Sequence, residues 1–298
     1  MPCLASEQPA LVSIRNVPGG FGGRMDLSAS VEEDVPRRGH SVTHPLDQDS
    51  FLEITREERF FCTLLAHGLL SSTTLRRGFY QLLHRASGVQ MNPDADSTEI
   101  YTEVAWLRDY WRALGDPQEW SQQLMQSRIA FLDRCLGTLR RSFAGVESKS
   151  FIRTSGKNPK IVSPGRWPLA ELGEDPPLER LKWAFNAKPD FIFVCEDRAV
   201  LLEVKVESPP GKKARYVQDE VQETLCRLLP AASPRLSTVG RAWLAPRPVD
   251  SAAETIRWSE VAGLVAQLPE EELDEFSRRG LARFAQRAAV EPSEESAP

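Results

Sequence analysis

Two short apolar runs separated by a polar break stand out in the pattern of hydrophobic and polar positions along the chain. The runs are Phe191–Cys195 and Ala199–Leu202, and the break between them is Glu196–Asp197. Continuous apolar runs of this length are typical of strands that are buried on both faces. A two-residue polar break is typical of a hairpin loop. The pattern therefore predicts an antiparallel hairpin in which Cys195 faces Arg198.

Three charged residues lie at the ends of these runs, where buried strands normally exclude charge. In the predicted register Asp190 lies directly opposite Glu203, and Lys205 follows two residues later on the same face as Glu203. A buried charge is unfavourable unless it is paired or bound to metal. Two adjacent carboxylates repel one another unless a divalent cation lies between them, and their oxygen atoms suit Mg²⁺ or Mn²⁺. A lysine beside such an ion can hold a water or neutralise a phosphate.

The spacing of these residues matches a known signature. A proline precedes Asp190, twelve residues follow it, and Glu203 then stands directly before Val204 and Lys205. This arrangement resembles the signature of the restriction-endonuclease-like nucleases, the PD-(D/E)XK superfamily. The resemblance implies that Mg²⁺ (or Mn²⁺) is bound by Asp190, Glu203 and the backbone carbonyl of Val204, while Lys205 assists the attacking water. The expected activity is metal-dependent hydrolysis of nucleic-acid phosphodiester bonds, with DNA expected ahead of RNA.

An acidic residue on an earlier helix is a further candidate ligand. A helix is predicted from about Thr55, because Thr55 and Glu58 can form a capping box and the apolar residues that follow share one helical face. Glu57 lies near the centre of that face, whereas Glu58 lies to one side. In the resembling family an acid on a helix before the hairpin often completes the metal site, so Glu57 is the expected ligand. The alternative is a first-turn glutamate that interacts favourably with the helix dipole.

A glutamine after the hairpin is a further candidate catalytic residue. A helix is predicted over about Ala214–Leu229, and Gln218 and Gln222 lie four residues apart on it. In several branches of the resembling family a polar residue at this place, often a glutamine, reaches the metal-bound water or the substrate. Gln222 is the expected residue. The alternative is an exposed polar face, which the neighbouring acids favour: Asp219, Glu220 and Glu223.

Two basic segments flank the predicted site, although the net charge of the chain is −5. A nucleic-acid enzyme needs positive charge where the phosphates lie, whatever its net charge. No acid occurs between Lys149 and Ala170. The expected nucleic-acid-binding residues are Arg153, Lys157, Lys160 and Arg166 in this segment, and Lys212 and Lys213 after the hairpin. The alternative for these side chains is ordinary solvated loop charge.

The order of the predicted elements indicates an α/β fold. The hairpin is preceded by a strand near Ser150–Arg153 and followed by the helix at about Ala214–Leu229 and a strand over Thr238–Ala245. This order fits a restriction-endonuclease-like core, a mixed central sheet flanked by helices, and the resemblance covers about a third of the chain, roughly Lys149 to Ala245. The expected domains are a flexible or irregular arm at 1–50, an all-helical subdomain at 51–145, the nuclease-like core at 146–290 and a disordered tail at 291–298.

Further helices are predicted on both sides of the hairpin. Inside the helical subdomain we expect helices over about Leu75–Ala86, from Asp96 to about Leu114, and from Asp116-Pro117 to near Gly145. In the core we expect a short helix or extended segment near Leu178–Phe185 and helices near Trp258–Gln267 and Pro269–Gln286. The aromatic residues of the helical subdomain have helical spacing and are expected in its core rather than stacked on bases: Tyr101, Trp106, Tyr110, Trp111 and Trp120.

Composition narrows the class of protein. A hydrophobic fraction of 41% and a charged fraction of 27% are typical of a soluble globular protein. No apolar run approaches the roughly 20 residues of a membrane span, and the first residues lack the basic start and apolar centre of a secretory signal. The cysteines are scattered without a Cys-x-x-Cys pair, which argues against the usual structural zinc sites and favours a reducing, cytoplasmic location. Phosphate-loop and Gly-x-Ser-x-Gly motifs are absent.

The sequence leaves alternatives to the nuclease open. The same fold could be a catalytically inactive module that binds nucleic acid or assembles with a partner, and the hairpin could be purely structural in a helical adaptor. By analogy alone, a role in prokaryotic restriction, phage defence or repair is expected. A homodimer is plausible in that setting, because cutting both strands of DNA often takes two sites, and a partner protein of a defence system is the other expected partner.

Overall fold

The computed structural model describes residues 57–92, 98–115, 121–156, 159–207, 211–213, 216–251 and 253–287, with the backbone alone for 212–213 and 285–287. All of these residues belong to one compact unit, Pro45–Pro298. No helix among them combines the length and apolarity that crossing a bilayer requires. The predicted arm at 1–50 and tail at 291–298 lie outside the described residues.

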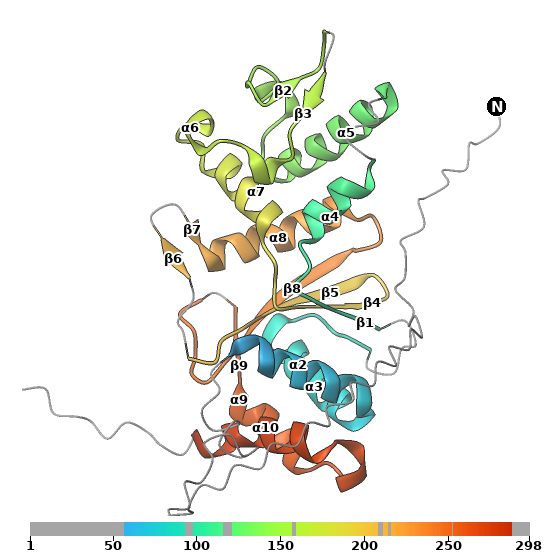
Figure 1. The fold of residues 1–298 in the computed structure, drawn as a ribbon, viewed down its shortest axis with the longest axis vertical. Coiled ribbons are helices and arrows are strands. Elements are labelled where there is room, and N and C mark those ends of the chain that lie inside the picture. Colours follow the sequence, from blue (N-terminus) through green and yellow to red (C-terminus); the bar gives the residue numbers. More distant parts are fainter. Residues whose placement is uncertain are drawn as a thin grey trace, which may run out of the picture. The chain divides into compact units, whose positions relative to one another are not determined.

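A five-stranded mixed sheet forms the centre of the fold (Figure 1). Its strand order is β1-β4-β5-β8-β9, and the strands are β1 (Glu99–Thr102), β4 (Phe191–Cys195), β5 (Arg198–Val204), β8 (Thr238–Ala245) and β9 (Thr255–Arg257). The pairs β1–β4 and β4–β5 are antiparallel, whereas β5–β8 and β8–β9 are parallel. The predicted α/β class, with a mixed sheet flanked by helices, is confirmed.

The β4–β5 hairpin has the predicted register. Cys195 pairs with Arg198 and Phe191 pairs with Leu202. Glu196 closes the turn with a φ of 56°, in the left-handed region that tight hairpin loops use. One step beyond the last pair, the same register brings Asp190 and Glu203 together at the open end of the hairpin.

Helices cover both faces of the sheet. Successive strand residues point to opposite faces, and in β4 and β5 most residues on both faces are apolar and buried. Phe191, Phe193 and Leu202 belong to a cluster with the helices on one face: α2 (Glu58–Ser71), α3 (Thr73–Ser87), α9 (Trp258–Ala266) and α10 (Glu275–Arg287). Ile192 and Leu201 belong to a second cluster with α4 (Trp106–Ala113), α5 (Gln122–Thr138), α7 (Pro176–Asn186) and α8 (Gln218–Ala232). Figure 1 shows the two groups of helices on opposite sides of the strands.

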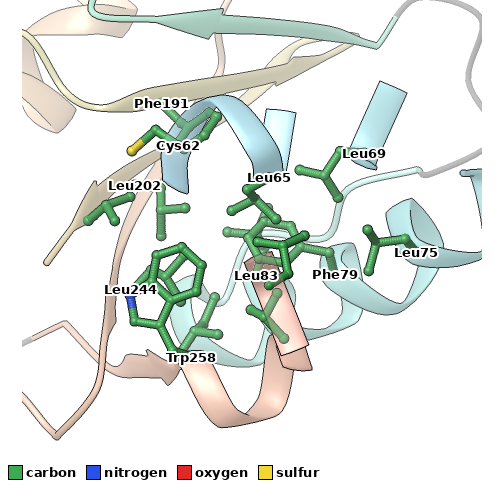
Figure 2. Packing of buried hydrophobic residues seen from close by; sticks show 14 of the residues in the cluster. Cys62, Leu65, Leu69, Leu75, Phe79, Leu83, Phe191, Leu202, Leu244 and Trp258 are labelled. Atoms are coloured by element: carbon green, nitrogen blue, oxygen red, sulfur yellow. The ribbon is translucent and has the colours of Figure 1, made fainter. Parts of the chain in front are cut away.

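The first cluster fixes α2 against the sheet. Figure 2 shows Cys62 of α2 beside Phe191 of β4, and Leu65 turned toward the same interior as Leu244 and Trp258. The Phe61 ring lies edge-on to the Trp258 ring, with centroids 6.2 Å apart. Helix α2 therefore begins close to the end of β5, which positions its first turn beside the open end of the hairpin.

Smaller elements complete the described fold. Two two-stranded sheets are formed by β2 (Ile152–Arg153) with β3 (Lys160–Ile161), and by β6 (Lys212–Lys213) with β7 (Tyr216–Val217). The remaining short helices are η1 (Phe143–Gly145), η2 (Pro164–Arg166), α6 (Leu169–Leu172) and η3 (Glu270–Glu272). The predicted strand at Ser150–Arg153 thus exists only as β2, and it lies outside the central sheet.

The prediction that 51–145 is an all-helical subdomain was wrong. The expected helix from Asp96 to about Leu114 is instead the strand β1 followed by the shorter helix α4, which begins at Trp106. Tyr101 pairs with Ile192, so β1 supplies hydrogen bonds to the outer edge of β4. Ile100 and Tyr101 are residue types that favour strands, and this pairing overrides the helical periodicity. Because β1 completes the central sheet, residue 145 does not separate two compact units.

Other elements follow the sequence closely. The strand β8 and the helices α3, α7 and α9 lie where they were predicted. The predicted helix start at Asp116-Pro117 lies outside the described residues, and α5 begins at Gln122 with the Ser121 side chain accepting a hydrogen bond from Leu124 N. Helix α8 begins at Gln218 rather than 214, and α10 begins at Glu275 after η3.

Candidate metal centre

Asp190, Glu203 and Lys205 lie together at the open end of the hairpin, and all three are buried. Asp190 immediately precedes β4, and its Oδ2 accepts a hydrogen bond of 2.7 Å from Val204 N. Its backbone carbonyl accepts a weaker one of 3.4 Å from Glu103 N, at the end of β1. The side chain of Asp190 is thereby held against β5, beside the position of Glu203.

Lys205 is the positive centre of this group. Its Nζ lies 2.8 Å from the Val204 carbonyl oxygen, 3.4 Å from Glu203 Oε1 and 3.2 Å from Glu58 Oε1. Its backbone is fixed on both sides, because Lys205 N donates to Leu244 O at 2.7 Å and the Trp258 indole donates to Lys205 O at 2.8 Å. Three oxygens, two from the end of β5 and one from α2, therefore surround the ammonium of Lys205.

Two glutamines of α8 hold the carboxylate of Glu203. The Gln222 amide donates to Glu203 Oε2 at 2.8 Å, and the Gln218 amide donates to Glu203 Oε1. Gln222 is buried, and its amide oxygen has no hydrogen-bond partner among the described residues. The structure thus brings Gln222 to the site for which it was predicted, and it adds Gln218, over which the sequence analysis preferred Gln222.

A closed set of contacts fixes the start of α8 relative to the sheet. Asp219, next to Gln218, is paired with Arg241 of β8 and accepts a hydrogen bond from Ser251. The Ser251 hydroxyl also accepts one of 3.0 Å from the Trp243 indole. Trp243 is the residue that pairs with Glu203 between β5 and β8. The contacts therefore run from Glu203 through α8 and the loop after β8 and back to the strand beside Glu203.

The buried carboxylates hold protons more tightly than free ones. Burial raises the pKa of Asp190 to about 6, opposed by the hydrogen bond from Val204 N and the charge of Lys205. Burial also raises the pKa of Glu203 to about 8, and the negative charge of Asp190 raises it further while Lys205 opposes the rise. With Glu58 included, three carboxylates share one ammonium, so the ionised site has an excess of two negative charges.

The donor atoms of the site fit a divalent cation. Carboxylate and carbonyl oxygens are the ligands that Mg²⁺ and Mn²⁺ prefer, and one such ion would balance the excess negative charge. The ammonium of Lys205 already contacts the Val204 carbonyl, Glu203 and Glu58 oxygens, so a positive charge is favoured at this point. Across the described ranges, however, no three Asp, Glu, His or Cys side chains are arranged as a ready-made metal site.

The acid that α2 contributes differs from the predicted one. Glu57 is the N-cap of α2 and its side chain is exposed, whereas Glu58 is half-buried and pairs with Lys205. The prediction placed Glu57 at the centre of the apolar face because it treated that residue as helical. The helix begins one residue later, so the packing of α2 turns Glu58 toward the site. Thr55, the other half of the predicted capping box, lies outside the described residues, and Glu57 makes no side-chain cap.

Glu103 is a second acid that the sequence did not single out. It directly follows β1, and its φ of 56° is uncommon for a residue with a side chain. Its charge contributes to the raised pKa of Asp190. Its side chain pairs with Arg59 at 3.6 Å. No periodicity or motif points to Glu103, because its place depends on the pairing of β1 with β4.

Four of the six predicted basic residues lie in two small sheets. Arg153 and Lys160 are exposed and pair directly across β2 and β3, and Arg166 is exposed in η2. Figure 1 shows β2 and β3 beside α5 and α6. Lys212 and Lys213 form β6 next to α8, with their side chains outside the described part, and Lys157 lies wholly outside it.

The comparisons with known proteins identify no relative. No protein-family model, no curated protein and no solved structure matches the chain. The resemblance to the PD-(D/E)XK nucleases therefore rests on the sequence around the hairpin alone.

Proposed function

We propose that the protein is a metal-dependent nuclease that hydrolyses phosphodiester bonds, with DNA ahead of RNA as its substrate. The observation that carries this proposal is the meeting of Asp190, Glu203 and Lys205 at the end of one hairpin. All three charges are buried, and pure stability would favour apolar residues at such positions. Catalysis gives a reason for these buried charges, because the proposed reaction needs a metal ion, held by the carboxylates, beside a proton donor, Lys205.

Each residue of the site has a role in this proposal. Asp190, Glu203, the Val204 carbonyl and Glu58 would hold the cation, which when bound would stabilise the charge that develops on the phosphate. Lys205 donates hydrogen bonds to a phosphate oxygen or to the attacking water. The Gln222 amide oxygen, which has no partner among the described residues, can accept a hydrogen bond from that water.

The placement of Arg153 and Lys160 supports binding of a polyanion. Like charges that face one another directly across a two-stranded sheet repel each other. A phosphate backbone bound along β2 and β3 would relieve this repulsion. We assign nucleic-acid contact to these two residues and to Arg166, and we extend it as a proposal to Lys157, Lys212 and Lys213.

A second candidate function is a nuclease-fold module that binds nucleic acid or a partner without turnover. The observation that favours it is the full set of contacts around Lys205. Its ammonium already gives the oxygens of Glu58, Glu203 and Val204 a positive partner, so they do not need a metal ion for that purpose. A cytoplasmic role in prokaryotic restriction, phage defence or repair, and assembly as a homodimer or with a defence partner, remain proposals that rest on the resemblance.

Incubation with circular and linear DNA, and in parallel with RNA, in the presence of Mg²⁺ or Mn²⁺ tests the proposal. We expect the wild-type protein to cleave DNA, and Asp190→Asn and Lys205→Ala to lose this cleavage. Asp197→Asn, in the exposed hairpin turn, is the matched control and should retain it. Folding of each variant is checked by circular dichroism. Cleavage that persists in both site variants would show that this site does not carry it and would end the proposal. No metal-dependent cleavage by the wild type would favour the non-catalytic module.

A further inference from the structure

Two aromatic side chains pack on one another outside both hydrophobic clusters. Trp183 of α7 and Tyr216 of β7 meet edge to face, with ring centroids 5.5 Å apart and planes at 78°. Both are half-buried, and neither belongs to the clusters that fill the two faces of the sheet. Core packing therefore does not account for this pair, although it accounts for Trp111 and the half-buried Tyr101 and Trp106 in the second cluster.

The pair lies beside the candidate metal centre. A Cβ atom on Gly211 would lie 3.6 Å from Tyr216 Cε1 and 3.5 Å from Gln218 Oε1, so the Tyr216 ring and the Gln218 amide are neighbours. The Gln218 amide donates to Glu203. Burial raises the pKa of the Tyr216 hydroxyl, and the charge of Glu203 raises it further, which agrees with this proximity.

Trp183 has features of a ligand-contacting residue. Its indole N–H is buried and has no hydrogen-bond acceptor among the described residues. An unpaired buried donor is unfavourable, and a bound ligand can satisfy it after a small movement. The ammonium of Lys182 lies 5.6 Å from the centre of the Trp183 ring and donates to Gly165 O at 3.0 Å. Aromatic surface and positive charge thus occur together at Trp183.

We propose that Trp183 and Tyr216 form a stacking site for an unpaired nucleobase next to the phosphate that the metal centre cleaves. This inference rests on the proposed function and narrows its substrate class to single-stranded nucleic acid, or to a duplex with unpaired bases. The faces of paired bases inside a duplex are covered by their neighbours, so only an unpaired base can stack on these rings. Such stacking contributes about 1–3 kcal/mol per base.

Binding rather than cleavage provides the test. The Asp190→Asn protein, which should not cleave, is titrated into a fluorescent oligothymidylate and, separately, into a fluorescent, fully paired duplex of two annealed strands, and anisotropy is measured. Adding Trp183→Ala or Tyr216→Ala should weaken binding of the single strand roughly tenfold and leave duplex binding within about twofold. Trp183→Phe should keep most of the affinity, because phenylalanine retains a stacking face.

A matched aromatic pair serves as the control. Tyr101 and Trp106 also meet edge to face, with centroids 5.4 Å apart and planes at 67°, but they pack on the second cluster. Trp106→Ala should not change the affinity for the single strand. The inference is overturned if Trp183→Ala and Tyr216→Ala leave single-strand binding unchanged or weaken duplex binding equally. If the Asp190→Asn protein binds neither probe, the proposed function falls together with the inference.

Discussion

The ammonium of Lys205 lies 3.2 Å from Glu58 Oε1, and this ion pair joins residues 147 positions apart in the chain. It connects the first turn of α2 to the end of β5, on the side where Asp190 and Glu203 meet. Only about a quarter of the Glu58 side chain is exposed, at 27%, so solvent screens the pair less than it would a surface ion pair. The pair makes Glu58 part of the candidate metal centre.

Substitution of the two adjacent glutamates should have different effects. Glu58→Gln removes a negative charge and one of the carboxylates that would hold the cation, and should lower Mn²⁺ affinity and metal-dependent cleavage by at least the roughly 10–100-fold that loss of even an outer partner of a metal ligand costs. Glu57→Gln changes an exposed side chain and should leave both within about twofold. Isothermal titration with Mn²⁺ gives the affinities, and a larger loss for Glu57→Gln would exclude the role given to Glu58.

The stability of the protein in a chelating buffer should fall as pH rises from 5 to 8. The pKa values of Asp190 and Glu203 are raised in the fold to about 6 and about 8, so the native state holds protons that the unfolded chain has released. Their contribution is complete below pH ~4 and is lost as pH passes the raised values, by up to about 1.4 kcal/mol per pH unit for each proton.

Urea unfolding across this pH range measures the effect, with Glu203→Gln as the comparison. Because Gln does not titrate, the stability of the variant relative to the wild type should increase with pH. Added Mg²⁺ or Mn²⁺ should flatten the wild-type curve, because a bound cation favours the ionised carboxylates. A wild-type stability that is constant or rises between pH 5 and 8, in parallel with the variant, would contradict the raised pKa values.

The contacts of Asp219 should keep the Gln218 and Gln222 amides of α8 hydrogen-bonded to Glu203. Asp219→Asn removes the ion pair with Arg241 and should loosen the start of α8, so that the side-chain amides of Gln218 and Gln222 exchange with solvent faster. Nitrogen-15 NMR of glutamine-labelled protein measures this exchange directly. Asp197→Asn is the control, since Asp197 also accepts from a serine and lies near an arginine, but at the other end of β5. Unchanged exchange in Asp219→Asn would show that Asp219 does not position α8.

Two glycines provide a test of the packing between α3 and the sheet. A Cβ on Gly240 of β8 would lie 2.6 Å from Val89 Cγ2, closer than real Cβ contacts, and 3.1 Å from Ser87 O, which is tighter than most of them. Gly240→Ala should therefore destabilise the protein by about 1–3 kcal/mol. Gly263 lies inside α9, and no neighbouring atom lies within 4 Å of the place that an alanine methyl would take, so Gly263→Ala should stabilise the protein by about 0.5–1 kcal/mol. Thermal unfolding distinguishes the two, and equal shifts would contradict the packing of β8.

The hairpin and the meeting of its charged ends could be predicted from the sequence. Local patterning was sufficient there, because the two-residue loop and the period of two fix which residues face one another. The same reasoning placed Gln222 on the following helix, four residues after Gln218. Both relationships depend only on neighbours within one short segment.

The partners that arrive from distant segments could not be predicted in this way. The choice between Glu57 and Glu58 depends on where α2 begins and on how it packs against Trp258. The strand β1 exists because β4 offers an unpaired edge, and Glu103 reaches the site only through that pairing. The packing of Trp183 on Tyr216, which lies near Gln218, was missed because the two rings come from elements that are not adjacent in the chain.

A direct titration with Mn²⁺ tests the central claim that Asp190 and Glu203 seat a divalent cation. Wild-type protein should bind the ion and gain thermal stability with it, whereas Asp190→Asn and Glu203→Gln should each lose most of the binding and the gain. Asp197→Asn should behave as the wild type does. Mn²⁺ binding of equal strength in the wild type and in both site variants, or none in the wild type, would contradict the account.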